Sequence, residues 1–512
     1  MSLLIRRAKI VGGENENSEL KDIFVSEEKI SAIGDFPNKN AEVIIDAQGA
    51  YLSPGFIDVN TDSDHYLSIL DHPSQEDFIK QGVTTIIGGM CGASLAPLLY
   101  GSLESIRKWG DIGTININWR TMREFLETLD KKPLAVNFAT LAGHSTIRRA
   151  LIGEHIRDLT KNELRVFGTI LEEAQKEGAF GLSTGLGYAH SLRTPYTELK
   201  FLNEIVKRYD GVYATHLRNN ATELAKSVDE TIKIAAETGV RTVISHFMPI
   251  EGSERAYQEA LEKIESIPEK TQLRFDVYPS ETSVLAIYTF LPLWAQNGGR
   301  ETMLANLKDE WLASRIIKDI AKINPEDFVI AQATGNDFLV KKSLKEIAGF
   351  YDTASYSAAL VKLMATTQLN ATIFYKNING ALIKKAIRCR RSLIATNSAS
   401  FRDSGKILKP ERALSTFTKF LGMAEGAKLM PFKKAINKIT NEPAKMFGLV
   451  GRGEIKEGNS ADLTIFSMSD GNTSEMKKVD VKSVVVNGKL VLKDGTFTEK
   501  FPGKNLRHKM LN

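Results

Sequence analysis

Residues 54–62, PGFIDVNTD, read as a buried β-strand that ends abruptly in polar side chains. A second apolar run, TTIIGG at 84–89, is followed closely by Cys91. The runs YATH at 213–216 and VISH at 243–246 each end in a histidine, His216 and His246. Parallel strands bring their carboxyl ends to one mouth in a (β/α)₈ barrel, and thiolate and imidazole are ligands that suit zinc. These strand ends therefore predict a metal site at the mouth of a TIM-type barrel.

The bulk composition indicates a globular enzyme-sized chain rather than a nucleic-acid or membrane protein. At 512 residues the chain exceeds one ordinary core, so more than one lobe is expected. Lys and Arg exceed Asp and Glu by only 67 − 62 = 5, which is too dilute a charge to indicate nucleic acid. No apolar run is long enough to span a membrane. The two cysteines, Cys91 and Cys389, cannot build a disulfide framework, which predicts reduced thiols and a cytoplasmic location.

The order of patterns along the chain predicts an α/β protein with a second, composite domain. Short apolar runs separated by turn residues fill 1–53 and 448–500, and Asn487-Gly488 is a strong two-residue hairpin signal. Neither end has enough strands alone, so we expect both termini to pair into one β-sandwich. Alternating strand and helix patterns predict the barrel over 54–447, with an insertion at about 286–350 over its mouth. Residues 501–512 are expected to form a frayed basic tail.

Several motifs occur in a shared order along the chain. They are GFIDV at 55–59, QGVTT at 81–85, CGASLAP at 91–97, GHSTIR at 143–148, GLSTGL at 181–186, THLR at 215–218, ISH at 244–246, DVYP at 276–279, LPLWA at 291–295, NEPAKMFGL at 441–449 and GEIKEGNSADL at 453–463. In these motifs the chain resembles the N-acyl-D-amino-acid deacylase (D-aminoacylase) branch of the amidohydrolase superfamily, over essentially its whole length. The resemblance implies that Cys91, His216 and His246 hold one tightly bound Zn²⁺.

Three positions depart from the pattern that this resemblance implies. The opening strand of the family ends in His-x-His, whereas this chain has Asn60 and Asp62, which leaves a second metal position incomplete. The family carries a general-base aspartate late in the barrel, and here SLIATNSAS at 392–400 puts Asn397 in that slot. An amide cannot accept a proton near neutral pH. Met248 stands where the family commonly has a lysine near the substrate carboxylate.

Two explanations fit these departures. In the first, Asp62 points into the mouth, because it lies two residues beyond Asn60 on the same face of the strand. Asp62 would then take over the missing base, with Asp64 or His65 as back-ups, and both Asp62 and Asn60 are further candidate metal ligands. In the second, the site has lost turnover and keeps only the fold and the zinc. We name Arg218, Tyr188 and Tyr278 as candidate substrate contacts. His144 either orients the metal ligands through hydrogen bonds or has a purely structural role.

The prediction is a metal-dependent hydrolase of C–N amide bonds whose substrate is a small molecule, an N-acyl-D-amino acid or a related amide. The alternatives are a catalytically silent zinc-binding protein that recognises a ligand or partner, and a cyclic amidase of the dihydroorotase or hydantoinase kind. The absence of a lysine at an obvious metal-bridging strand position counts against the cyclic amidase.

Overall fold

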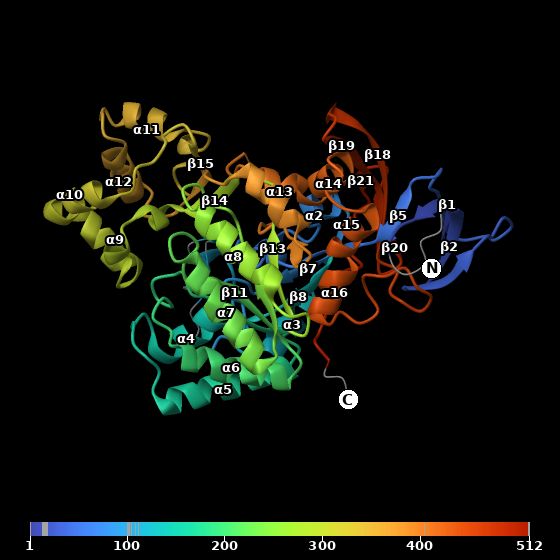
Figure 1. The fold of residues 1–512 in the computed structure, drawn as a ribbon, viewed down its shortest axis with the longest axis horizontal. Coiled ribbons are helices and arrows are strands. Elements are labelled where there is room, and N and C mark those ends of the chain that lie inside the picture. Colours follow the sequence, from blue (N-terminus) through green and yellow to red (C-terminus); the bar gives the residue numbers. More distant parts are fainter. Residues whose placement is uncertain are drawn as a thin grey trace.

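A barrel forms the centre of the molecule, with a β-sheet domain on one side and an inserted unit on the other (Figure 1). The computed structural model describes residues 2–12, 19–99, 103, 105–107, 109–110, 112–403 and 405–509. In the view of Figure 1 the inserted unit (yellow) and the sheet built from both termini (blue and red) lie at opposite ends of the long axis.

The barrel strands pair in parallel in two runs, β6-β7-β8 and β17-β13-β12-β11-β10-β9. Only Leu141 separates β8 from β9, and a parallel bridge between Thr61 and Ser398 joins the chain just beyond β6 and β17, which closes the ring. The strand bounds are β6 (Phe56–Asp58), β7 (Val83–Gly88), β8 (Asn137–Thr140), β9 (Ala142–Gly143), β10 (Gly181–Gly185), β11 (Val212–His216), β12 (Arg241–Ile244), β13 (Leu273–Val277) and β17 (Ser392–Ile394).

Amphipathic helices cover the outside of the barrel. The capping boxes Thr121/Glu124 and Thr160/Glu163 start two of them, because each pair satisfies backbone N–H groups that the first turn leaves open. The bounds are α1 (Ser68–Asp71), α2 (Glu76–Ile79), η1 (Ile112–Thr114), α3 (Met122–Asp130), α4 (His144–Ile152), α5 (Lys161–Lys176), α6 (Tyr196–Arg208), α7 (Leu224–Thr238), α8 (Glu254–Ser266), α13 (Gly380–Arg388), α14 (Glu411–Gly426), α15 (Phe432–Ile439) and α16 (Asn441–Phe447).

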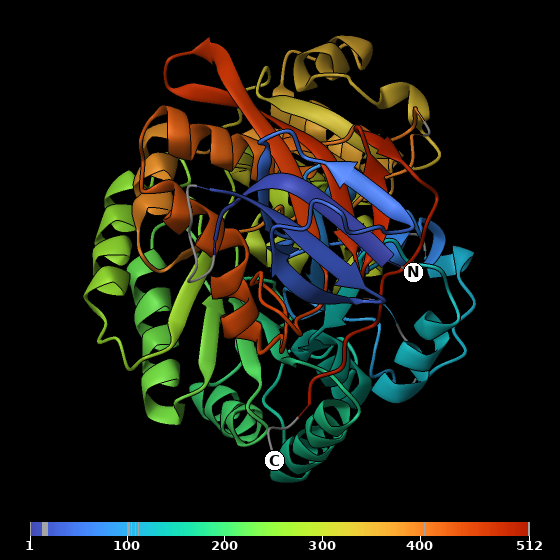
Figure 2. The same cartoon turned by 90° about the vertical axis from the view of Figure 1, so that its right-hand side faces the viewer.

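Both ends of the chain share one sheet, in the order β21-β20-β19-β18-β5-β1-β2-β3 with β4 also pairing β1. The antiparallel pairing of β5 with β18 joins the two ends, and the strands lie side by side in Figure 2. Residues of both ends also share one buried apolar cluster. The bounds are β1 (Ser2–Ile10), β2 (Leu20–Ser26), β3 (Lys29–Gly34), β4 (Val43–Asp46), β5 (Tyr51–Pro54), β18 (Leu463–Thr473), β19 (Met476–Val486), β20 (Lys489–Lys493) and β21 (Thr496–Phe497).

The hairpin predicted at Asn487-Gly488 is present between β19 and β20. Both turn residues have positive φ, 44° and 76°, as a two-residue turn of this twist requires. A Cβ at Gly488 would lie 2.0 Å from the carbonyl oxygen of Glu27, so only glycine fits there.

The inserted unit runs from β14 to β16 and is longer than the predicted 286–350. Its middle strand, β16, pairs with both β14 and β15, so the chain must complete three strands before it returns to the barrel at α13. The unit has its own buried core. Its elements are β14 (Thr282–Ala286), η2 (Ile287–Phe290), η3 (Leu293–Gln296), α9 (Gly299–Lys308), α10 (Glu310–Asp319), β15 (Phe328–Ala333), η4 (Asp337–Leu339), α11 (Leu344–Phe350), α12 (Tyr356–Thr366) and β16 (Ala371–Lys376).

The described part of the C-terminal tail is bonded to the barrel, contrary to the expectation that it frays. The N–H groups of Gly503, Leu506 and His508 donate to carbonyl oxygens of Leu134, Phe138 and Gly178 at 2.7–3.0 Å. Residues 510–512 lie outside the described residues.

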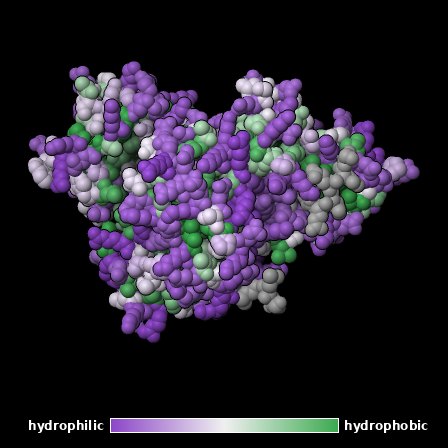
Figure 3. All heavy atoms as spheres, viewed as in Figure 1, coloured by the Kyte–Doolittle hydropathy of each residue, from purple (hydrophilic) through white to green (hydrophobic). Residues whose placement is uncertain are grey.

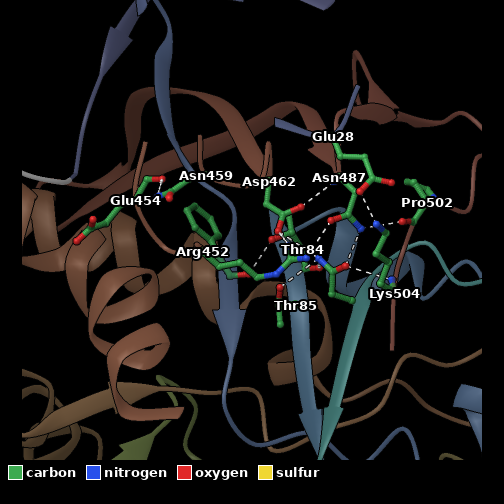
Figure 4. A network of polar contacts seen from close by, with 12 residues as sticks. Glu28, Thr84, Thr85, Arg452, Glu454, Asn459, Asp462, Asn487, Pro502 and Lys504 are labelled. Atoms are coloured by element: carbon green, nitrogen blue, oxygen red, sulfur yellow. Dashed lines mark hydrogen bonds and ion pairs between the residues drawn. The ribbon is translucent and has the colours of Figure 1, made fainter. Parts of the chain in front are cut away.

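A buried polar network ties the barrel, the terminal sheet and the tail together (Figure 4). Asp462 forms an ion pair with Arg452 and accepts from Asn137 Nδ2 (3.2 Å) and from the Asn487 backbone N–H (2.7 Å). Asn137 belongs to β8 of the barrel, and its Oδ1 accepts from the backbone N–H of Lys504 in the tail (3.1 Å). The network therefore connects three parts of the chain that lie far apart in sequence.

Replacing Asp462 with alanine is expected to lower the free energy of unfolding by about 3–5 kcal/mol, because it leaves the nearly buried Arg452 without its counter-charge. Urea denaturation measures the change. Asp470→Ala is the matched control, since its ion pair with Lys477 is exposed on the Asp470 side and should contribute little. Equal free energies of unfolding for the two variants would contradict a stabilising role for the network.

Hydrophilic residues cover most of the face shown in Figure 3, and apolar residues lie there in separate groups. Among the described residues, no helix is both long enough and apolar enough to cross a lipid bilayer.

Candidate metal centre

Three side chains converge at the mouth of the barrel from the carboxyl ends of separate strands. Cys91 follows β7, His216 is the last residue of β11, and His246 follows β12. One donor atom of each lies within 4.8 Å of the donor atoms of the other two. Cys91 Sγ is 3.3 Å from His246 Nε2, and the two imidazole rings meet edge to face with centroids 4.5 Å apart. The structure thus brings together the three side chains that the sequence predicted as metal ligands.

The backbone around this group is held in unusual conformations. Cys91 and His246 have φ values of 53° and 37°, in the left-handed region that non-glycine residues rarely adopt. The His246 N–H donates to the buried carboxylate of Asp276 at 2.8 Å, and the Gly92 N–H donates to Ser183 Oγ at 3.0 Å. Left-handed backbone conformations of non-glycine residues cost free energy and persist only where surrounding contacts hold them. Residues in such conformations are common at functional sites.

The chemistry of the group fits a zinc-like cation. Sulfur and imidazole nitrogen are the donors that zinc prefers, and three protein ligands leave a position open for water. Burial lowers the pKa of His246 to about 4, so its ring is neutral at ordinary pH, which is the form that coordinates a metal. Among the described residues, Asp62 is not part of the group within 4.8 Å.

Asp62 instead forms an ion pair beside the group. Its Oδ1 lies 3.0 Å from Nδ1 of His65, and the two side chains are 15% and 2% exposed. Burial opposes ionisation of Asp62, but the contact with His65 and the charges of His65 and Arg412 outweigh it and lower the pKa of Asp62 below its ordinary value. Asp62 is therefore a carboxylate at neutral pH.

A cavity of about 310 Å³ opens over these residues. Its floor includes Cys91, His216, His246, Asp62 and Asn397. Its outer wall is largely apolar and comes in part from the inserted unit, through residues such as Val284, Leu285, Ala286 and Phe374. Such a space, apolar with a few convergent polar groups, is typical of small-molecule sites.

Known proteins resemble this chain along its whole length. A family model described as the amidohydrolase family matches residues 412–492. D-Aminoacylase of Alcaligenes xylosoxydans xylosoxydans is 29% identical, over 98% of this chain and 97% of that protein. N-Acyl-D-aspartate deacylase of the same organism is 30% identical, over 90% of this chain and 85% of that protein. The chain belongs to the N-acyl-D-amino-acid deacylase branch of the amidohydrolase superfamily.

Solved structures agree with this assignment. Two crystal structures of D-aminoacylase have a TM-score of 0.78 and 27% identity to this chain and cover 99% of each chain; one of them concerns a binuclear metal centre with one-metal activation and second-metal attenuation. The prediction of an amidohydrolase barrel with a β-sandwich domain from both termini is thereby confirmed.

Asn60, one of the predicted candidate metal ligands, lies in a buried polar contact just beyond β6. Asn60 is fully buried, its Nδ2 donates to Asp276 Oδ2 at 3.1 Å, and its Oδ1 has no hydrogen-bond partner among the described residues. Asp276 in turn accepts the His246 N–H, so the Asn60 amide supports the backbone of a candidate ligand. Asn60 is not among the described residues that line the cavity.

Asn397, in the slot of the deacylase aspartate, does line the cavity. Its φ is 44°, and its N–H donates to the carbonyl oxygen of Asn60 at 2.9 Å. Asn397 therefore lines the cavity from a left-handed backbone position, and its amide cannot serve as a base.

Arg218 does not reach the cavity, so the expectation that it contacts substrate is not supported. Its guanidinium forms an ion pair with Glu230 (2.9 Å) and donates to backbone carbonyl oxygens of Leu192 and Thr194. Tyr188 and Tyr278 do line the cavity, and the Tyr188 ring lies 4.9 Å from that of His216.

Sequence reasoning missed Arg412, the one arginine among the described residues that line this cavity, which include no lysine. It is 4% exposed, and its guanidinium carbon lies 4.7 Å from the ring centre of Tyr278. Arg412 sits in the first turn of α14 rather than at a strand end, so the pattern that revealed the other residues could not reveal it.

His144 packs away from the cavity. Its Nε2 contacts Glu198 Oε1 at 2.8 Å, Arg148 contacts the same oxygen at 3.2 Å, and its ring lies against Phe167. Of the two roles left open for His144, this geometry favours packing within the helical layer.

Proposed function

We propose that this protein is a metal-dependent amidohydrolase that hydrolyses N-acyl amino acids, with N-acyl-D-amino acids as the substrate class that its relatives suggest. The reaction adds water across the amide bond and releases a carboxylate and an amine. The convergence of Cys91, His216 and His246 on the floor of the 310 Å³ cavity is the observation that carries the proposal.

These three side chains would hold one cation per chain. When bound there, zinc would act as a Lewis acid that polarises the scissile carbonyl and lowers the pKa of the attacking water. Asn60 and Asp62 stand on the opening strand where the resemblance implies His-x-His, so the proposal includes no second metal position there.

Asp62 would perform the proton transfers. Its carboxylate lines the cavity beside the cluster and is ionised, as a proton acceptor must be. In the proposed reaction Asp62 accepts a proton from the attacking water and passes it to the leaving nitrogen. That nitrogen departs as a neutral amine, and the second proton of the water stays on the acid product, which loses it to solvent to become the carboxylate.

Arg412 would bind the α-carboxylate of the substrate, the task that Met248 cannot perform. A buried guanidinium at a cavity wall offers charge-assisted hydrogen bonds to a carboxylate. The wall around it is otherwise apolar, which suits an acyl chain or an apolar side chain.

Arg412→Met is expected to raise KM for N-acyl amino acids by about 10–100-fold, the loss of a charged hydrogen bond worth about 1.5–3 kcal/mol. Steady-state kinetics measures the change. The matched comparison is the same substrate as its carboxamide, which lacks the anion and should lose much less. An equal loss for both substrates would contradict the assignment.

Metal quantification combined with a turnover screen tests the proposed function. The screen covers N-acyl-D-amino acids, N-acyl-L-amino acids and cyclic amides. The expected result is about one zinc per chain with turnover of N-acyl amino acids. A purified protein that neither contains nor takes up zinc would overturn the proposal.

Asn397 favours one rival, a zinc-binding protein that has lost turnover, because the slot of the deacylase base holds an amide. Zinc at one ion per chain without turnover of any amide in the screen would support that rival. A cyclic amide as the preferred substrate would point to the hydantoinase-like alternative.

A further inference from the structure

His65 lies between Asp62 and the loop that carries Cys91. On one side its Nδ1 is 3.0 Å from Asp62 Oδ1. On the other side its Nε2 is 3.2 Å from the carbonyl oxygen of Ala93, two residues after Cys91. The imidazole ring therefore spans the gap between the proposed proton acceptor and the cysteine loop.

The surroundings of the ring define its proton positions. A carbonyl oxygen only accepts, so Nε2 carries a hydrogen, and Nδ1 lies at ion-pair distance from the Asp62 carboxylate. Nε2 therefore donates to the cysteine loop, while Nδ1 faces the Asp62 carboxylate. Asp64, which is buried and accepts the Gly89 N–H at 2.6 Å, is a second acidic side chain next to His65 in the sequence.

The pair also orients the carboxylate. Oδ1 of Asp62 is engaged by His65, and the same side chain lines the cavity. The Asp62 backbone is fixed at the same time, since its N–H donates to the carbonyl oxygen of Ser398 at 2.8 Å.

We propose that His65 is a positioning residue that holds Asp62 against the cysteine loop, so that one oxygen of the carboxylate stays directed at the reacting water. The inference rests on the proposed function, because it assigns how the proposed proton acceptor is placed. A buried carboxylate needs a counter-charge for stability alone, so the test must separate placement from mere stabilisation.

Two substitutions of His65 each keep one contact of the imidazole ring and remove the other. The amide of asparagine in His65→Asn reaches the place of Nδ1 and keeps the contact with Asp62, whereas the longer His65→Gln reaches the place of Nε2 and keeps the contact with Ala93. We expect H65N to retain at least about a tenth of kcat and H65Q to lose about 100-fold, as misplacement by about 1 Å does elsewhere. KM and the zinc content should stay unchanged in both.

The opposite pattern would overturn the proposal. If His65 only anchors the cysteine loop, H65N loses zinc and H65Q is spared. Equal losses of kcat in the two variants would likewise contradict a role through Asp62. The same two substitutions at His155, an exposed residue outside the described lining of the cavity, serve as the control.

A second readout needs no turnover. The midpoint of urea unfolding is compared for H65Q in the native background and in the Asp62→Asn background. If the pair exists, the shift caused by H65Q shrinks to less than half when Asp62 has already lost its charge. Equal shifts in both backgrounds would overturn the pairing. An inactive native protein with a coupled pair would instead reject the proposed function and leave the contact established.

Discussion

Cys91→Ala is expected to remove the metal and abolish turnover. Losing even an outer partner of a ligand typically costs about 10–100-fold in metal affinity, so losing the thiolate itself should cost at least about 100-fold. Dialysis against metal-free buffer followed by elemental analysis measures the metal, and initial rates measure the turnover. Alanine keeps the Cβ, so it meets the same left-handed backbone at φ 53° and adds no new strain there.

Cys389→Ala is the matched control for this experiment. Cys389 is also buried, but it follows α13 and precedes the start of β17, which is the end of the barrel away from the mouth. Its removal should leave metal content and turnover unchanged. If Cys91→Ala kept about one tightly held zinc per chain, Cys91 would not be a ligand and the proposed centre would be wrong.

The strand ends made the centre of this site predictable from sequence. Parallel strands of a barrel share one direction, so residues that follow β7, β11 and β12 must meet at one mouth whatever their separation in the chain. Likewise, incomplete sheets at both termini must find partners, and β5 pairs with β18. Backbone geometry alone thus determines both the meeting of the strand ends at the mouth and the pairing of the two termini.

Side-chain partners were not predictable in the same way. Arg218 and Arg412 are both arginines near strand or helix ends, yet Arg218 turns to Glu230 on α7 while Arg412 enters the cavity. The choice depends on which acceptors lie within reach of a long, flexible side chain after folding. The role of Asn60 is similar, since its bond to Asp276 spans 216 residues of sequence.

The extent of the inserted unit was underestimated for a related reason. Residues 351–376 hold a helix and a strand, α12 and β16, that resemble another βα unit of the barrel. Only the antiparallel pairing of β16 with β14 and β15 assigns them to the insertion. Pairing direction is a long-range property that local periodicity does not carry.

Asp62→Asn is expected to lower kcat by about 10²–10⁴ with zinc content unchanged, the usual cost of losing a general base. Asparagine keeps the size of the side chain and removes the proton acceptor. Because Asp62 lies outside the group of donors within 4.8 Å, metal content should not depend on its charge. Loss of zinc in this variant would instead make Asp62 a ligand, and full turnover would exclude it as the base.

Asn397→Asp in the Asp62→Asn background extends this prediction, because it returns a carboxylate to the slot that the deacylase resemblance assigns to the base. Asn397 and Asp62 line the same cavity, and Thr61 and Ser398 next to them are bridged, so the two positions face the reaction from adjoining strands. We therefore expect the double variant to recover at least about tenfold of the lost turnover. Recovery would mean that the proton acceptor has moved between neighbouring strands. Failure to recover, with zinc intact, would mean that the proton acceptor is not interchangeable between the two strands.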